Sequence, residues 1–282
     1  MGADGHSLNV SSALILPLKD IHLTDYPPVL VILHAYHLDV AERMIFRLAS
    51  INAYNFDIPM RLVITTDSES KVGKIERMLA RWPRCAPMGH VVEVHPNRGR
   101  NVAPFLAACG AHARAEDLIL HLHTKKSPHA PEFAGWGEYL FDCLAGSRDV
   151  VESVMAIMKD PKAGLIYPAH YRSIANIIIW GPNFVAARDI LRSLNVQITP
   201  LTPLEFPAGM MFWTRLAALQ PLLDMRIDHE QFEPEAGQTD GTLAHALERA
   251  MIYIVEATKH FAQPVLWSAR MKDCWTESRQ HD

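Results

Sequence analysis

Cysteine is scarce in this chain of 282 residues, and none of the four cysteines stands in a CxxC pair or at another spacing typical of zinc ligands. They are scattered along the chain as Cys85, Cys109, Cys143 and Cys274. This pattern argues against a structural zinc site on cysteine, and it favours a reducing compartment.

Long apolar runs and an excess of positive charge are also absent. The longest apolar runs, residues 29–33 and 177–180, are far too short to cross a bilayer. Residues 1–12 lack the basic start and apolar core of a signal peptide. The net charge of −4 argues against a nucleic-acid partner, although it is compatible with a local basic cleft. We therefore expect a soluble, cytoplasmic protein without a transmembrane segment.

The composition that is present, 49% apolar and 21% charged residues, is typical of a globular protein with a substantial core. In the first half of the chain, short apolar runs predict strands, and segments with apolar residues at helical spacing predict helices between them. We expect strands at 29–33, 60–65, 91–94 and 118–120, and helices at 39–53, 66–81 and 102–114. This βαβαβαβ order predicts an α/β fold with a mostly parallel, Rossmann-type sheet and helices on both faces.

The second half of the chain has a looser pattern. We expect strands at 164–167 and 210–213, and helices at 136–144, 150–158, 183–194 and 239–258. Residues 1–27 form a loose lead-in, in which residues 14–16 can add an edge strand. Because no repeat or linker interrupts the rest, we predict a single domain over residues 28–282, with halves at 28–127 and 128–282.

Two polar clusters, residues 97–101 and 121–127, follow or end predicted strands. Together they hold four cations, which are Arg98, Arg100, Lys125 and Lys126. Ligands of open α/β sheets bind at the carboxyl ends of the strands. A helix that begins near Asn101 also offers free N–H groups there, so we predict a phosphate pocket at this edge.

His121 and His123 lie on one face of a strand if the strand extends that far, which is a geometry that two metal ligands can have. No third ligand follows at a recognisable spacing, and the neighbouring Lys125 and Lys126 would repel a metal ion. The alternative is that both histidines lie at the edge of the core and bond to neighbouring carbonyls. We favour lysines that neutralise a diphosphate over a metal site.

Two aspartates lie at the ends of predicted elements: Asp67 just after a strand and Asp240 at the start of the last helix. Asp67 belongs to a capping-box pattern at residues 66–69, so it can cap the helix or hold a ribose or base. Asp240 can cap the last predicted helix, or it can accept a hydroxyl proton, because a helix N-terminus keeps a carboxylate ionised. His245 and Glu248, one turn apart on that helix, can equally be a surface pair.

Residues 206–213 run from small residues into bulky apolar ones. Ala208 and Gly209 leave space for a substrate, and Trp213 can form a stacking wall beside it. A buried strand explains the same pattern, and we favour that interpretation for residues 210–212.

Together these segments resemble the rhamnan synthesis protein F family of bacterial polysaccharide glycosyltransferases. Five motifs carry the resemblance, in family order over roughly residues 28–250: His34-Ala-Tyr36, Asn97-Arg-Gly-Arg100, His123-Thr-Lys-Lys-Ser127, Phe206-Pro-Ala-Gly209 with Met211-Phe-Trp213, and Asp240-Gly-Thr-Leu-Ala-His-Ala-Leu-Glu-Arg249. The resemblance implies a GT-A-like fold and the transfer of rhamnose or a related deoxysugar from a nucleotide sugar, such as dTDP-rhamnose. The implied acceptor is a cell-surface glycan or a lipid-linked glycan, so any membrane contact would be peripheral, at the inner face of the cell membrane.

The chain departs from the family, and from ordinary GT-A enzymes, at two places. The family usually has Asp where this chain has Asn101, which removes a negative charge and bears on donor choice and activity. Ordinary GT-A enzymes carry an Asp-x-Asp metal motif after the strand at 118–120, where this chain has His123-Thr-Lys125. We therefore predict metal-independent transfer without a cofactor, in which lysine balances the charge of the diphosphate.

On this basis we assign roles to individual residues as a hypothesis. The catalytic residues are Lys125 and Asp240, the latter as the base of an inverting reaction, and the acceptor contacts are Gly209 and Trp213. Donor contacts are expected from His34, Asp67, Asn97, Arg98, Gly99, Arg100, Asn101, His123, Thr124 and Lys126. The alternatives are a metal-dependent hydrolase based on His121 and His123, and a non-catalytic module that binds nucleotides or glycans.

Overall fold

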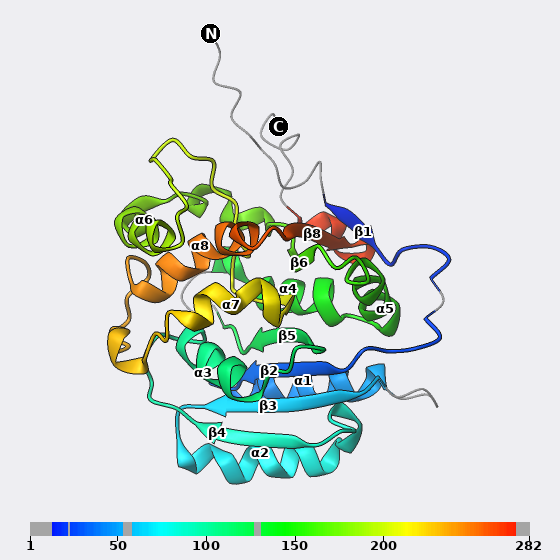
Figure 1. Ribbon diagram of the computed structural model, residues 1–282. Helices are drawn as coiled ribbons and strands as arrows, with labels where there is room; N and C mark the ends of the chain where they lie inside the picture. The colour runs from blue at the N-terminus through cyan, green and yellow to red at the C-terminus, as the bar shows by residue number, and fades with distance from the viewer. Residues whose placement is uncertain (1–12, 22, 53–57, 127–130, 275–282) are drawn as a thin grey trace.

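The computed structural model describes residues 13–21, 23–52, 58–126 and 131–274, and these form one eight-stranded sheet covered by helices (Figure 1). In chain order the strands are β1 (Leu14–Leu16), β2 (Val29–His34), β3 (Met60–Thr66), β4 (His90–Val94), β5 (Leu118–His123), β6 (Ala163–Pro168), β7 (Phe212–Arg215) and β8 (Phe261–Trp267). Their order across the sheet is β1-β8-β6-β7-β5-β2-β3-β4. Neighbouring strands are parallel except β7, which runs antiparallel to both β5 and β6. The predicted α/β class with a mostly parallel sheet is confirmed.

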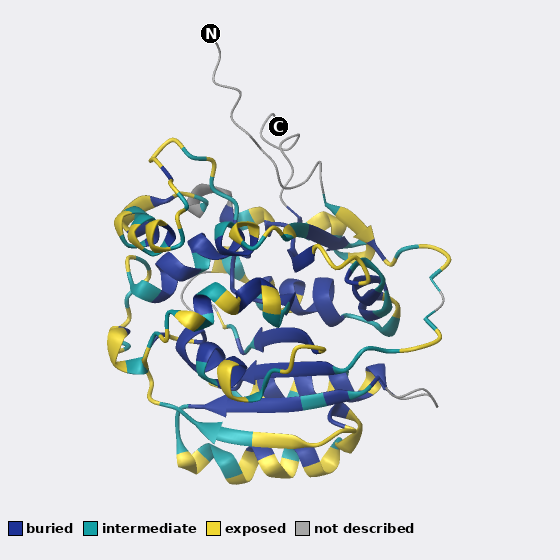
Figure 2. Cartoon of the chain, in the orientation of Figure 1, coloured by how far each residue is buried: buried dark blue, intermediate teal, exposed yellow. Residues whose placement is uncertain are grey.

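Helices cover both faces of the sheet, as the βαβ order requires (Figures 1 and 2). One face packs against α1 (Leu38–Ile51), α2 (Glu69–Arg81), α4 (Trp136–Ala145) and α5 (Arg148–Ile157). The other packs against α3 (Val102–His112), α7 (Leu216–Asp224) and α8 (Leu243–Ala257), with α6 (Phe184–Ser193) packed on α8. Short 3-10 helices lie at η1 (Pro83–Cys85), η2 (Pro131–Phe133), η3 (Arg172–Ile177), η4 (Gly181–Asn183), η5 (His229–Gln231) and η6 (Ser268–Asp273).

Strand β2 lies inside the sheet, between β5 and β3, and is buried along its whole length. Its apolar, β-branched sequence suits a strand that is covered on both faces. The chain proceeds from β2 to β3 and β4 on one side, and β5 then returns to the other side of β2. Such a reversal of strand order opens a crevice at the carboxyl ends of the two strands, where His34 and His123 are register partners.

Three features of the fold were not predicted. Helix α7 contains Pro221 and strand β8 contains Pro264, and both were missed because proline weakens the sequence signal of a helix or a strand. The antiparallel direction of β7 was also missed. The edge strand expected at residues 14–16 is present as β1, paired with β8, whereas residues 1–12 lie outside the described part of the chain.

The predicted capping box at residues 66–69 is wrong. Strand β3 continues through Thr66, whose hydroxyl donates to the carbonyl of Ala35 at 3.1 Å. The N-cap of α2 is Ser68, whose hydroxyl accepts a hydrogen bond from the N–H of Ser70. Asp67 therefore does not cap the helix, and its carboxylate pairs instead with Lys71 one turn into α2.

Within the ranges described above, no helix is both long enough and apolar enough to span a membrane.

Candidate active site

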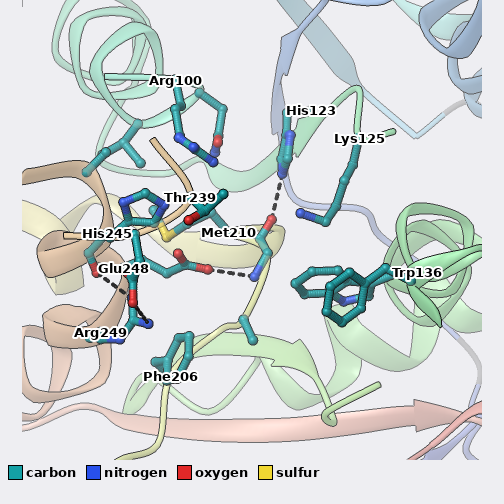
Figure 3. A pocket seen from close by; sticks show the side chains of 17 residues that line it. Arg100, His123, Lys125, Trp136, Phe206, Met210, Thr239, His245, Glu248 and Arg249 are labelled. Atoms are coloured by element: carbon teal, nitrogen blue, oxygen red, sulfur yellow. Dashed lines mark hydrogen bonds and ion pairs between the residues drawn. The ribbon is translucent and has the colours of Figure 1, made fainter. Parts of the chain in front are cut away.

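A cavity of about 510 Å³ opens at the carboxyl end of β5, between the first turns of α3, α4 and α8 (Figure 3). Its wall also includes the segment that leads into β7. The lining residues are Arg100, Asn101, Val102, His123, Lys125, Phe133, Trp136, Phe206, Ala208, Gly209, Met210, Thr239, Asp240, Ala244, His245, Glu248 and Arg249. Six residues predicted from the sequence thus meet in one place: Arg100, Asn101, His123, Lys125, Gly209 and Asp240.

Some residues of the loop after β4 line the cavity, and others only stabilise the loop. The guanidinium of Arg98 donates to the carbonyls of Glu230 and Phe232, at 3.2 Å each, and does not line the cavity. Gly99 has φ +66°, and a Cβ at this position would lie 2.6 Å from the ring of Phe232. Asn97 is exposed and also lies outside the cavity. Of these three predicted donor contacts, Arg98 and Gly99 therefore hold the loop against residues 230–234, and none of the three lines the cavity.

Arg100 and Asn101, in contrast, face the cavity. The backbone N–H of Arg100 donates to the Glu235 carboxylate at 3.0 Å, and its guanidinium donates to the Gln238 carbonyl. Asn101 is buried at the start of α3, and its side-chain Nδ2 has no hydrogen-bond partner among the described residues. A buried amide without a partner is costly, so an Asn101 that lines a cavity points to a ligand oxygen as its missing acceptor.

At the end of β5, too, some residues line the cavity and others only stabilise the structure around it. The ring of His123 donates from Nε2 to the carbonyl of Gly209 at 2.6 Å, and burial together with the charge of Lys125 lowers the pKa of His123 to about 3. The hydroxyl of Thr124 accepts from the N–H of His37 at 2.9 Å and contacts the carbonyl of His34. His123 therefore lines the cavity as a neutral donor, while Thr124 holds the two strand ends together.

Lys125 and Lys126 have opposite surroundings. The ammonium of Lys125 lies 3.9 Å from the ring centre of Trp136, and it forms no ion pair with any residue the structure describes. Burial lowers the pKa of Lys125, and the nearby Glu248 carboxylate opposes that shift. Lys126 instead forms an ion pair of 2.7 Å with Asp39 outside the cavity. Of these two lysines, only Lys125 is placed to meet a ligand in the cavity.

Asp240 enters the cavity from the turn before α8 and is held from both sides. Its Oδ1 accepts from the side chain of Asn183 at 2.8 Å, and its Oδ2 pairs with the Arg249 guanidinium at 3.3 Å. Arg249 is only 5% exposed and also donates to the carbonyl of Ile179. Asp240 is thus the counter-charge of a buried cation.

Two residues of α8, which the sequence also allowed as a surface pair, instead line the cavity and are functional candidates. Glu248 accepts from the backbone N–H of Gly209 at 2.6 Å, and burial raises the pKa of Glu248. His245 is buried beside it, and burial and the charge of Arg100 lower the pKa of His245 to about 4. The available signal was a charged pair, Glu248 and Arg249, in the middle of an otherwise largely apolar helix.

Three other predicted site residues lie outside the cavity. His34 is buried at the end of β2, bonds Thr65 through Nδ1 at 2.9 Å, and has a pKa that burial lowers to about 4. Asp67 pairs with Lys71, as described above. Trp213 is 1% exposed, and its indole N–H donates to the carbonyl of Leu144 in α4 at 3.0 Å. Trp213 therefore packs into the core on the other face of the sheet, and we do not retain it as an acceptor contact.

The walls of the cavity carry aromatic rings as well as charges. Phe133, Trp136 and Phe206 line it, and the indole nitrogen of Trp136 is buried without a hydrogen-bond partner in the described part of the chain. Aromatic faces and unpaired N–H donors together suit a ligand with apolar C–H faces and many oxygens.

The histidine pair of β5 does not form a metal site. His121 is fully buried and stacks on Phe105 with a centroid distance of 4.1 Å, while its ring lies 6.3 Å from that of His123. No group of three or more His, Cys, Asp or Glu side chains among the described residues is arranged to hold a metal ion. The Nε2 of His123 is already engaged with Gly209. The residues present therefore do not support the hydrolase alternative.

Comparison with known proteins places the chain in a sequence family. The model of the family described as rhamnan synthesis protein F matches residues 9–260. Two relatives from strains of Xanthomonas campestris pv. campestris, both described as uncharacterized protein WxcX, are 37% and 36% identical over 236 residues. The alignments cover 83% of this chain and 32% of each relative, so the chain spans about a third of the length of these proteins.

Three solved structures show a partial similarity in backbone fold. A mannosyltransferase from Pyrobaculum calidifontis, in complex with GDP-Man and Mn²⁺, aligns over 90% of this chain and 60% of its own, with 15% identity and a TM-score of 0.49. TarS from S. aureus aligns over 86% and 58%, with 9% identity and a TM-score of 0.44. Glucosyl-3-phosphoglycerate synthase from Mycobacterium tuberculosis aligns over 86% and 70%, with 15% identity and a TM-score of 0.39.

Proposed function

The chain belongs to the rhamnan synthesis protein F family, and on this premise we propose that it is a glycosyltransferase, which moves a sugar from a nucleotide-sugar donor to a glycan acceptor. The proposed sugar is rhamnose or a related deoxysugar, carried by a donor such as dTDP-rhamnose. The proposed acceptor is a cell-surface or lipid-linked glycan, which the chain would meet on the cytoplasmic side by peripheral contact with the membrane.

The observation that carries this proposal is the environment of Lys125. Its ammonium lines the cavity, rests on the ring of Trp136 and has no carboxylate partner among the described residues. Lys125 is half-buried, and a partly desolvated cation without an ion-pair partner is costly, so the missing negative charge is expected on the ligand. Arg100 lies on the same cavity and adds a second positive charge. A diphosphate placed between Arg100 and Lys125 would satisfy both.

The remaining lining residues suit a sugar next to that diphosphate. Asn101 and Trp136 offer unpaired N–H donors, and the rings of Phe133 and Phe206 offer apolar faces. In the proposed reaction the acceptor hydroxyl attacks the anomeric carbon, and the nucleoside diphosphate leaves with inversion at that carbon. Lys125 and Arg100 stabilise the charge that develops on the departing diphosphate. A carboxylate of the cavity, either Asp240 or Glu248, takes the proton of the hydroxyl.

We propose that this reaction does not depend on a metal ion. Divalent cations in phosphate-transfer sites are held by carboxylates, and the strand end that faces the diphosphate here carries His123 and Lys125. Of the two carboxylates that line the cavity, Asp240 is engaged through both oxygens, with Asn183 and Arg249, and Glu248 is engaged through one oxygen, with Gly209, which leaves a single free carboxylate oxygen among the described lining residues. The donor set therefore does not fit a divalent cation, and the fixed cations take over its electrostatic role.

Nucleotide release from a panel of donors tests the proposal. The purified chain is incubated with dTDP-, UDP- and GDP-sugars and a mixture of glycan acceptors, and the nucleoside diphosphate and the product are measured by chromatography. At least one donor should give nucleoside diphosphate and glycoside in equal amounts. Nucleotide binding in calorimetry without release from any donor would instead identify a non-catalytic binding module.

A further inference from the structure

Two carboxylates line the cavity, and they differ in how many of their oxygens are free. Both oxygens of Asp240 are engaged, Oδ1 with Asn183 and Oδ2 with Arg249. Glu248 uses only Oε1, which accepts from the backbone N–H of Gly209 at 2.6 Å. Its other oxygen, Oε2, accepts no hydrogen bond from the residues that the structure describes. Figure 3 shows this carboxylate near the middle of the cavity, with Lys125 across from it.

The partner of Glu248 is held rigidly in place. The carbonyl of Gly209 accepts from His123 at 2.6 Å, so this one residue connects the end of β5 with α8. Gly209 has φ +89°, and a Cβ there would lie 2.5 Å from Leu140, so the backbone conformation is open only to glycine. A carboxylate anchored through one oxygen to such a backbone has its second oxygen fixed in direction.

We propose that Glu248, rather than Asp240, takes the proton from the acceptor hydroxyl; this inference rests on the glycosyl transfer proposed above. The acceptor oxygen forms a bond to the anomeric carbon of the donor sugar. The bond from that carbon to the diphosphate breaks, and its electron pair leaves with the nucleoside diphosphate beside Lys125 and Arg100. The hydroxyl proton moves to Oε2 of Glu248 and later passes to solvent.

The surroundings of Asp240 assign it a positioning role in the same site. Arg249 is buried, and Asp240 is the one carboxylate that the structure pairs with its guanidinium in the described chain. Asn183 also accepts from the N–H of Gly241 at 3.1 Å, which fixes the turn that carries Asp240. Removal of the Asp240 charge would leave the buried Arg249 without a counter-charge. The main effect should therefore be a loss of folding stability rather than of turnover.

The charge environment of Glu248 acts on its pKa in two opposing directions. Burial raises its pKa above the ordinary value, while the N–H of Gly209 and the cations around it act in the opposite direction. The titratable and charged groups that share the cavity with it are Arg100 from the α3 side, His123 and Lys125 from the end of β5, and Asp240, His245 and Arg249 from α8 and its preceding turn. A base must be deprotonated to act, so turnover should fall as the pH drops through this raised pKa.

The deciding experiment compares Glu248→Gln with Asp240→Asn in the nucleotide-release assay, on the donor that the wild-type chain uses. The amide oxygen of Gln can still accept from Gly209, so Glu248→Gln should keep donor affinity and melting temperature. It should lower kcat by about two to four orders of magnitude and abolish the acid limb of the pH profile. Glu256→Gln, at an exposed site on the same helix, is the matched control and should leave turnover unchanged.

Asp240→Asn should lose stability rather than turnover. Its melting temperature should fall by about 3–6 °C, because Arg249 loses its counter-charge, while turnover of the folded protein should fall no more than about tenfold. Glu248→Ala adds a chemical test, because formate can occupy the vacated space and accept the proton. Formate should restore part of the turnover of Glu248→Ala and none of that of Asp240→Asn.

The outcomes separate this inference from the function on which it rests. If the wild-type chain transfers sugar and Glu248→Gln keeps turnover within about threefold, or loses less than Asp240→Asn, the assignment of Glu248 is overturned while the glycosyltransferase stands. If no donor yields nucleotide with the wild-type chain, the proposed function fails, and the role of Glu248 fails with it.

Discussion

The loops after β4 and β5 reach the same edge of the sheet, and each carries two cations, yet they use them differently. In the loop after β4, the guanidinium groups of Arg98 and Arg100 both donate to backbone carbonyls of residues 230–238. In the loop after β5, Lys126 pairs with Asp39, while Lys125 has only an aromatic ring beneath it. A charge already satisfied by protein oxygens serves the fold, and a charge left over is available to a ligand. The difference predicts a ranking of the four cations.

Replacement of Lys125 should have the largest effect of the four. Lys125→Ala removes the cation that faces the departing diphosphate, so we expect turnover to fall by about two to three orders of magnitude, as for other fixed groups that stabilise a developing charge. Lys126→Ala, one residue away, should change turnover by less than about twofold, because an exposed ion pair with Asp39 contributes little. Initial rates at saturating donor measure both. Equal losses of turnover in the two variants would contradict the different roles given to Lys125 and Lys126.

Replacement of Arg100 should have a smaller effect, because part of its charge is shared with the carbonyl of Gln238 and, at 3.9 Å, with Glu235. We expect Arg100→Ala to raise the donor KM and to lower kcat/KM by about ten- to hundredfold. Arg98→Ala should instead lower the free energy of unfolding by about 1–2 kcal/mol, since two carbonyls lose a charged donor. Denaturant unfolding and steady-state kinetics separate the two. A larger kinetic than thermodynamic effect of Arg98→Ala would contradict the comparison.

Removal of divalent metal should have the smallest effect. If Lys125 and Arg100 supply the positive charge at the diphosphate, EDTA should change turnover by less than about twofold. Added Mg²⁺ or Mn²⁺ should likewise raise turnover by less than about twofold. The measurement is the initial rate after dialysis against EDTA, with and without the metal. Strong inhibition that the metal reverses would show that a cation is needed after all.

The first half of the fold was predictable because each of its strands is a separate apolar run. Buried runs such as residues 29–33 alternate there with helices of clear period, and the alternation itself implies parallel pairing. The second half gave weaker signals. Strand β7 has four residues and lies inside a longer apolar stretch, so its direction is set by the sheet on either side rather than by its own sequence.

The site was predictable in its location and only partly in its membership. Arg100, Asn101, His123 and Lys125 could be found because they end or follow strands that reach one edge of the sheet. The direction of each side chain was not predictable, since it depends on loop geometry such as the φ of +56° at Arg100. Glu248 could not be distinguished from a surface residue, because its contact with the site runs through Gly209, 39 residues earlier in the chain.

The reversed direction of β7 determines which part of the chain meets the ligand. In parallel strands the residues that follow the strand reach this edge, whereas in β7 the residues that precede it do so, which brings Gly209 and Met210 beside His123. The part of the chain between α6 and Phe206 can therefore vary in length or composition without altering the phosphate-facing loops, whereas Gly209 is fixed by its bonds to His123 and Glu248. Divergence between members of the family in what they glycosylate should concentrate in residues 194–205, while the exits of the parallel strands stay the same.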